Sequence, residues 1–181
     1  MLEKDVTPLA AKIELLLMDV DGVLTDGSLF YVPLVDGSVA EAKAFDATDG
    51  AAIGFARRAG IKTGIISGRS SPAVVRRAEE LRMDFLYQGL GRKKLSAFEE
   101  ILAKSNIPAE RICYAGDDVQ DLPILARVGF PIAVANAAAE VLSRVAYVTR
   151  ASGGRGAIRE IVELILKAQG KWDSLIGEFT R

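Results

Sequence analysis

The sequence predicts an α/β fold in which a parallel sheet is flanked by helices. Short apolar runs alternate along the chain with helix-like segments of about a dozen residues, a pattern typical of βαβ units and therefore of parallel strands. Half of the residues are hydrophobic and 26% are charged, as in an ordinary globular protein. No linker, internal repeat or low-complexity tract divides the 181 residues, so we expect one domain over 1–181.

Six apolar segments are the expected strands of the sheet. The first, "IELLLM", is apolar at nearly every position, which is typical of a strand buried on both faces. The fourth, "RICYAG", contains Cys113, which we interpret as a core residue. The expected strands are 13–18, 61–67, 84–88, 111–116, 131–135 and 146–149.

Helices are expected between these strands. One opens at positions 49–50 and stops before Gly60, a residue that suits a helix end. Another opens at Ser71 and Pro72, a favourable N-cap and first-turn pair, and extends to about residue 82. Further helices are expected at 92–104, shortly after 118, at 137–143 and from about 157.

Residues 28–44 break the alternation of strands and helices. They contain two extended runs around the turn sequence "VDGS". Two such runs around a glycine-containing turn predict a β-hairpin.

Amino-acid composition limits the catalytic groups, the binding partners and the cellular compartment that this protein can have. The net charge is −1, from 23 basic and 24 acidic residues, which argues against nucleic-acid binding. There is no histidine, so acid–base work falls to carboxylates, lysine, tyrosine or cysteine. One cysteine allows no intrachain disulfide and suits a reducing compartment. No apolar run approaches the length of a membrane helix and the N-terminus does not resemble a signal peptide, so we expect a cytoplasmic protein that binds no membrane.

Polar residues collect where the predicted strands end. Ligands of open α/β sheets bind outside the carboxyl ends of the strands, so these residues should converge on one crevice. They are Asp19 and Asp21 after the first strand, Ser67, Gly68 and Arg69 after the second, Lys94 at the start of a helix, and Asp117, Asp118 and Asp121 after the fourth.

This set suits Mg²⁺ and a phosphate. Clustered carboxylates require a counter-ion, and Mg²⁺ prefers oxygen ligands. Ser67, nearby backbone amides and Lys94 are donors for phosphate oxygens. Asp19, the carboxylate nearest the sheet, can attack phosphorus and form an aspartyl-phosphate. Asp21 can protonate the leaving alcohol and then deprotonate the hydrolytic water. Each motif alone is weak, since aspartates often cap turns, but their order and placement favour catalysis.

The motifs resemble those of the haloacid dehalogenase (HAD) superfamily of phosphatases. "DVDGVLTDG", "ISGR", Lys94 and "GDDVQD" match its four motifs in order over residues 13–121. The resemblance implies a Rossmann-like HAD fold, with Asp19 as nucleophile and Asp21 as acid/base. It also implies Mg²⁺ bound by Asp19, the backbone carbonyl of Asp21 and Asp117. Asp118 and Asp121 would lie behind these ligands.

A narrower resemblance covers nearly the whole chain. "KAFDATDG", "ISGRSS", "LYQG", "YAGDDVQDLP", "YVTRASGGRGAIRE" and "AQGKW" are similar to the 3-deoxy-D-manno-octulosonate (Kdo) 8-phosphate phosphatases of lipopolysaccharide biosynthesis. That family implies an acidic sugar phosphate as substrate and a β-hairpin in place of a cap domain. The hairpin would join the chains of a homotetramer, and a tail at about 170–181 would cover a neighbour's site. The implied substrate-binding residues are Asp21, Asp46, Ala47, Thr48, Asp49, Gly50, Gly68, Arg69, Arg77 and Lys94.

Two residues differ from the pattern of this family, so the sequence does not decide which sugar phosphate is the substrate. Thr48 and Gly54 stand where this family carries arginines, whose planar fork suits a sugar-acid carboxylate. The 9-phosphates of nonulosonic acids such as KDN or sialic acid are therefore the alternative substrates. The "GGRG" sequence at 153–156 is either a turn before the last helix, which we favour, or a loop that aims Arg155 at the site.

Two other classes of protein remain as rivals. A phospho-accepting receiver domain uses a similar residue set, but it would carry its aspartate after the third strand, where this chain has "YQG". A catalytically inactive structural member of the superfamily is the other rival, and the complete motif set argues against it.

Overall fold

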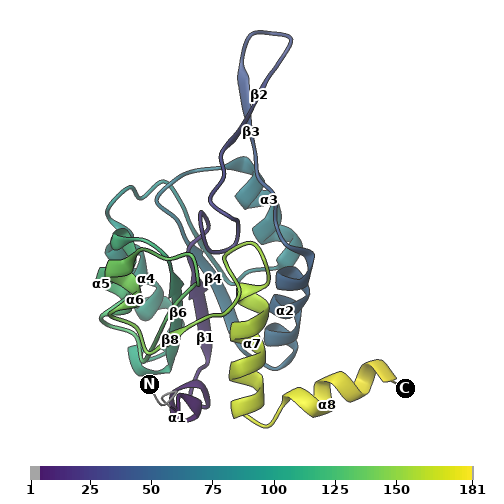
Figure 1. Ribbon diagram of the computed structural model, residues 1–181, viewed down its shortest axis with the longest axis vertical. Coiled ribbons are helices and arrows are strands. Elements are labelled where there is room, and N and C mark those ends of the chain that lie inside the picture. Colours follow the sequence, from purple (N-terminus) through teal and green to yellow (C-terminus); the bar gives the residue numbers. More distant parts are fainter. Residues whose placement is uncertain (1–4, 181) are drawn as a thin grey trace.

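The computed structural model describes residues 5–180, and at its centre lies a six-stranded parallel sheet (Figure 1). The strand order is β5-β4-β1-β6-β7-β8. All six predicted strands are confirmed, each slightly shorter than expected. They are β1 Leu15–Met18, β4 Lys62–Ile66, β5 Phe85–Tyr87, β6 Ile112–Gly116, β7 Phe130–Ala133 and β8 Tyr147–Val148.

The central strands are apolar along their whole length because both of their faces are covered. Every residue of β1 and of β6 is buried. Leu15 of β1 is in register with Lys62 of β4 on one side and with Ile112 of β6 on the other. The chain runs outward from β1 through β4 to β5 and then returns to β6, so the strand order reverses beside β1. Ligands of such sheets bind at this reversal.

Helices cover both faces of the sheet (Figure 1). Helices α2 and α7 lie on one side, and α4 and α5 lie on the other. The α-helices are α1 Thr7–Ala10, α2 Ala47–Arg58, α3 Pro72–Leu81, α4 Lys94–Ser105, α5 Leu122–Leu125, α6 Ala139–Leu142, α7 Ala157–Ala168 and α8 Trp172–Gly177, and the 3₁₀ helices are η1 Ala109–Arg111, η2 Val119–Asp121 and η3 Glu178–Thr180.

The first long helix begins earlier than the sequence predicted. We expected α2 to open at positions 49–50, but it begins at Ala47. The Asp46 carboxylate accepts hydrogen bonds from the backbone N–H groups of Thr48 and Asp49, and so provides the N-cap. The glycine expected at the start is therefore inside the first turn.

The predicted hairpin is confirmed and stands away from the sheet (Figure 1). Strands β2 (Phe30–Pro33) and β3 (Val39–Ala42) pair antiparallel, with Phe30 opposite Ala42. Its large apolar side chains are in contact with solvent, which is unusual for so many in one segment. They are Leu29, Phe30, Tyr31, Val32, Leu34, Val35 and Val39.

The C-terminal tail folds against its own chain. Helix α8, which was not predicted, brings Trp172 to 6.0 Å from Phe55 of α2, ring centre to ring centre. Phe179 packs on the same ring at 5.6 Å, and Glu178 pairs with Arg58. These contacts hold the tail beside α2 and α7. Residue 181 lies outside the described residues.

Two smaller expectations concern the core and the membrane. Cys113 is fully buried, as predicted, and burial raises the pKa of its thiol. Within residues 5–180, the structure has no helix with the length and apolar character that a bilayer crossing requires.

Two alanine substitutions test the packing of the fold. A Cβ on Gly54, inside α2, meets nothing within 4 Å, so Gly54→Ala should raise the free energy of unfolding by about 0.5–1 kcal/mol through helix propensity. A Cβ on Gly129 would lie 2.1 Å from the Glu110 carbonyl oxygen, so Gly129→Ala should lower it by about 1–3 kcal/mol. Chemical denaturation measures both values, and equal effects would contradict the close backbone approach of 110 and 129.

Candidate active site

A cleft of about 170 Å³ opens at the carboxyl ends of β1, β4 and β6. Strand β1 leads into Asp19, β4 into Ser67 and β6 into Asp117, while α4 contributes its first residue, Lys94. The convergence follows from the parallel register of the three strands. The residues that line the cleft are Asp19, Asp21, Ser67, Gly68, Arg69, Lys94, Asp117, Asp118 and Gln120.

Lys94 is the buried cation of this cleft. Its Nζ lies 2.7 Å from Asp19 Oδ2 and 2.9 Å from Asp121 Oδ1, and its side chain is 4% exposed. Burial opposes the charge, but the two carboxylates outweigh it and hold the pKa of Lys94 above its ordinary value. Lys94 is therefore charged in its ion pair with Asp19.

Asp121 fixes the other residues of the cleft. Its Oδ1 accepts hydrogen bonds from Lys94 Nζ at 2.9 Å and from the Tyr114 hydroxyl at 2.6 Å. Its Oδ2 accepts from the backbone N–H groups of Asp117 and Asp118, at 3.0 Å and 3.3 Å. Both oxygens are thus engaged by protein donors, which places Asp121 behind the cation site.

Tyr114 belongs to this arrangement and was not predicted from the sequence. It lies in the middle of β6 and is fully buried. Burial raises the pKa of its phenol well above the ordinary value, so the hydroxyl donates to Asp121 as a neutral group. A tyrosine in an otherwise apolar strand was the available clue, because a buried hydroxyl requires a partner.

The carboxylate cluster of the cleft fits a divalent cation, with Asp19 and Asp117 as the available ligands and Asp121 behind them. One oxygen each of Asp19, Asp117 and Asp121 lies within 4.8 Å of the others. Asp117 Oδ1 is buried and, among the described residues, receives no hydrogen bond. Burial, together with the nearby carboxylates, raises the pKa of Asp117 to about 8 and that of Asp19 to about 7. The raised pKa values mean that the ionised carboxylates repel one another. A bound Mg²⁺, which prefers oxygen ligands, relieves this repulsion and favours the ionised form.

The backbone after Asp21 reaches this cation site through a glycine. Gly22 has a φ of +93°, and a Cβ on it would lie 2.1 Å from Asp117 Oδ2. Only a residue without a Cβ allows the main chain to pass so near that carboxylate. The predicted ligation by the Asp21 carbonyl is compatible with this approach.

Asp21 is held by cations from two segments. Its Oδ1 pairs with Lys43, and its Oδ2 lies 3.7 Å from Arg69 Nε. Glu41 pairs with both of these cations. Lys43 and Glu41 were not predicted, because their place in the hairpin stem gave no indication of a long-range contact with the first motif.

The residues at 46–50 have contacts of their own around α2. The Thr48 hydroxyl donates to Asp46, and the Asp49 carboxylate accepts from the backbone N–H of Arg159 at 2.8 Å. Gly50 makes room for Arg77, whose Nη2 lies 3.3 Å from the Asp46 carbonyl oxygen. Ala47 starts the helix. These residues lie beside the cleft and outside its lining, and their roles toward a substrate remain predictions.

Comparison with known proteins decides the family. A haloacid dehalogenase-like hydrolase family model matches residues 89–161. The chain is 42% identical to the 3-deoxy-D-manno-octulosonate 8-phosphate phosphatase of Escherichia coli K12 over 174 residues, which is 96% of this chain and 90% of that protein. The chain belongs to the Kdo 8-phosphate phosphatase family.

Solved structures of this family have the same fold. The Yersinia pestis Kdo 8-phosphate phosphatase is 42% identical, with a TM-score of 0.88 over 94% of this chain and 89% of that one. The Moraxella catarrhalis enzyme, solved with a magnesium ion, a phosphate ion and a Kdo molecule, is 39% identical, with a TM-score of 0.90 over 97% and 98% of the two chains. The predicted Rossmann-like HAD fold, its hairpin and the Mg²⁺ cofactor are thereby confirmed.

The "GGRG" loop of this family member packs directly on the first motif. The Asn136 side chain donates to the Gly22 carbonyl oxygen at 3.0 Å and accepts from the Gly153 N–H at 2.6 Å. A Cβ on Gly153 would lie 1.8 Å from that same carbonyl oxygen. Arg155 is 71% exposed and 3.4 Å from Asp26. The glycines thus serve backbone packing, which favours the turn interpretation.

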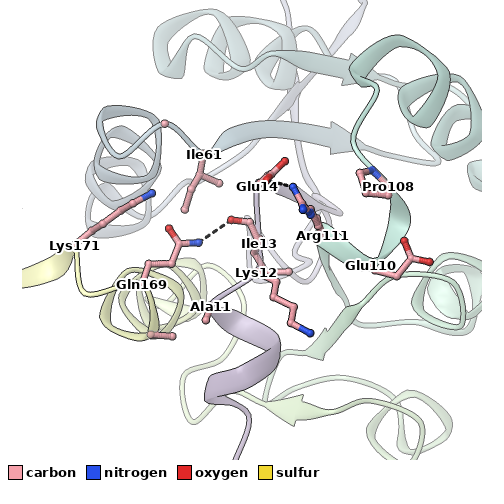
Figure 2. A pocket seen from close by; sticks show the side chains of 12 residues that line it. Ala11, Lys12, Ile13, Glu14, Ile61, Pro108, Glu110, Arg111, Gln169 and Lys171 are labelled. Atoms are coloured by element: carbon pink, nitrogen blue, oxygen red, sulfur yellow. Dashed lines mark hydrogen bonds and ion pairs between the residues drawn. The ribbon is translucent and has the colours of Figure 1, made fainter.

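A larger cavity, of about 890 Å³, lies at the amino ends of the strands (Figure 2). Glu14 and Arg111 form an ion pair there, and Gln169 donates to the Ile13 carbonyl oxygen at 2.7 Å. The cavity lies at the opposite ends of the strands from the active-site carboxylates, and none of the motif residues lines it. Size is therefore a poor guide to the active site here.

Thermal unfolding with and without Mg²⁺ tests the cation site. Mg²⁺ should raise the Tm, because it binds the folded carboxylates; at 100 times its Kd the gain is about 2.7 kcal/mol. Above pH 8, where the Asp117 carboxyl of the wild type is ionised, Asp117→Asn should raise the Tm in EDTA because it removes a buried like charge, and it should shrink the gain from Mg²⁺. Glu99→Gln, on the exposed face of α4, is the control. A full Mg²⁺ effect in Asp117→Asn would contradict this site.

Proposed function

We propose that this chain hydrolyses Kdo 8-phosphate to Kdo and phosphate, with Mg²⁺, in lipopolysaccharide biosynthesis. The observation that carries the proposal is the buried Asp19–Lys94–Asp121 arrangement beside Asp117, in a chain 42% identical to Kdo 8-phosphate phosphatases over 96% of its length. We also propose that residues 1–181 form one domain and that the enzyme acts in the cytoplasm, a reducing compartment that suits its single buried cysteine.

The first half of the reaction transfers the phosphoryl group to Asp19. A carboxylate oxygen of Asp19 forms a bond to phosphorus, and the bond from phosphorus to the sugar oxygen breaks. Asp21 donates a proton to that oxygen, so the sugar leaves as an alcohol. Ser67, the backbone amides that follow it and Lys94 hold the phosphate oxygens. Mg²⁺, held by Asp19, Asp117 and the Asp21 carbonyl, offsets the negative charge of nucleophile and phosphate.

The second half returns Asp19 to its starting state. Asp21, now ionised, takes a proton from a water molecule whose oxygen attacks phosphorus. The bond between phosphorus and Asp19 breaks, and inorganic phosphate leaves. Asp118 and Asp121 do not react in this scheme; Asp121 keeps Lys94 and the backbone of 117–118 in place.

The substrate side of the site rests on Arg69, Arg77 and residues 46–50. We propose that Arg69, which is 45% exposed beside Asp21, faces the sugar. Thr48 and Gly54 replace family arginines in this region, so a nonulosonate 9-phosphate is the substrate to be tested against Kdo 8-phosphate.

Phosphate release over a small substrate panel with Mg²⁺ tests this function. The panel contains Kdo 8-phosphate, KDN 9-phosphate, sialic acid 9-phosphate, mannose 6-phosphate and p-nitrophenyl phosphate. Kdo 8-phosphate should give the highest kcat/KM, and Asp19→Asn should abolish turnover because it removes the nucleophile. Preference for a 9-phosphate would reassign the substrate, and activity that survives in Asp19→Asn would reject the mechanism.

We further propose that the hairpin joins four chains in a homotetramer. Seven large apolar side chains between Leu29 and Val39 are exposed, and burial against other copies would remove them from water. Strands β2 and β3 also have outer edges free to pair with strands of another copy. The C-terminal tail is placed over a neighbour's site in this proposal, and that arrangement requires it to leave its contacts with α2.

Disrupting one face of the hairpin tests the assembly. Phe30→Glu combined with Val32→Glu places two charges on adjacent exposed positions of one face of β2. The molar mass measured by light scattering should fall from that of a tetramer to that of a smaller species. Val148→Glu, at an exposed apolar position on β8, should leave the mass unchanged. An unaltered mass in the double variant would contradict assembly through this surface.

A further inference from the structure

The return strand of the hairpin brings two charged side chains against Asp21 and Arg69, which line the active-site cleft. Glu41 lies in β3, and Lys43 follows the end of that strand by one residue. The Lys43 side chain is only 1% exposed, although lysine is ordinarily a surface residue. A charged lysine buried to this extent requires carboxylate partners, and Lys43 finds them at the active site.

Four charged side chains form a closed ring. Lys43 Nζ pairs with Asp21 Oδ1 and lies 3.4 Å from Glu41 Oε1. The other oxygen of Glu41 pairs with Arg69, and Arg69 Nε lies 3.7 Å from Asp21 Oδ2. Each carboxylate therefore meets two cations, and each cation meets two carboxylates.

We propose that Lys43 is a positioning residue that aims the Asp21 carboxylate at the leaving-group oxygen. The proposal rests on the acid/base role of Asp21 in the proposed function. Lys43 fixes one carboxylate oxygen of Asp21, and Glu41 forms a second ion pair with Lys43 at 3.4 Å. The ring thus sets the orientation of Asp21 from the stem of the hairpin, a segment about 20 residues further along the chain. In this respect the hairpin stem supplies a part of the catalytic geometry.

If Lys43 positions the general acid, its loss should slow the reaction more for poor leaving groups than for good ones. Protonation matters most when the leaving group is a strong base. Phenyl phosphate releases a phenol with a pKa of about 10, whereas p-nitrophenyl phosphate releases an anion that is stable near neutral pH. Neither substrate has a sugar carboxylate, so a loss of sugar contacts affects neither. The ratio kcat/KM reports the step in which the alcohol leaves, whatever the rate of the later hydrolysis.

Lys43→Met keeps the length of the side chain and removes its charge. It should lower kcat/KM for phenyl phosphate by about 10–100-fold, a part of the roughly 10²–10⁴-fold that a general acid contributes. The loss for p-nitrophenyl phosphate should be less than about threefold on the same reasoning. Lys62→Met, an exposed lysine on β4, should change neither value. Thermal unfolding shows whether each variant is folded, and Glu41→Gln, which releases Lys43, should give a smaller selective loss if Lys43→Met does not fold.

A double-mutant cycle separates this role from others. If Lys43 acts through Asp21, then Lys43→Met should cause no further loss on phenyl phosphate in an Asp21→Asn background. Additive losses, or equal losses on both substrates, would overturn the proposal. Failure of the proposed function gives a different result: a wild-type chain without phosphatase activity, or Asp21→Asn as active as wild type on phenyl phosphate.

Discussion

The active site depends on one buried cation, the ammonium of Lys94. It joins Asp19 at the end of β1 to Asp121 in η2, and Asp121 in turn holds the Tyr114 hydroxyl and the backbone at 117–118. Removing one partner from such a buried pair costs about 3–5 kcal/mol, because the remaining charge is left unpaired. The nucleophile, the cation site and part of the fold's stability therefore rest on the same interactions, and their geometry is fixed before a substrate binds.

The sheet and the central residues of the site could be predicted because they rest on local patterns. Apolar runs such as "IELLLM" mark strands that are buried on both faces, and parallel strands direct the residues at their carboxyl ends to one edge of the sheet. Asp19, Ser67 and Asp117 each come directly after such a run, so their convergence is a result of topology alone. The start of α2 was placed too late, because Asp46 was not recognised as the N-cap.

The residues that the sequence did not reveal are those whose roles are set by distant contacts. Tyr114 lies in a strand where any large apolar residue would fit the pattern, and only the position of Asp121 gives its hydroxyl a purpose. Lys43 and Glu41 lie in the stem of a hairpin whose orientation relative to the first motif no local pattern encodes. Helix α8 is short and is stabilised by contacts with α2 and α7, so its own propensity gave little indication.

The ion pairs around Lys94 and those around Arg69 differ in how much free energy is needed to break them. Lys94 and Asp19 are 4% and 9% exposed, whereas Arg69 and Asp21 are 45% and 22% exposed. Charge interactions weaken steeply with solvent access, so the pairs around Arg69 can exchange partners at little cost while the pair at Lys94 cannot. The buried half suits the phosphoryl group, which is the same in every phosphomonoester. The exposed half suits the variable sugar, and differences among related enzymes in the sugar they accept are therefore expected to arise there, without change to Asp19, Lys94 or Asp117.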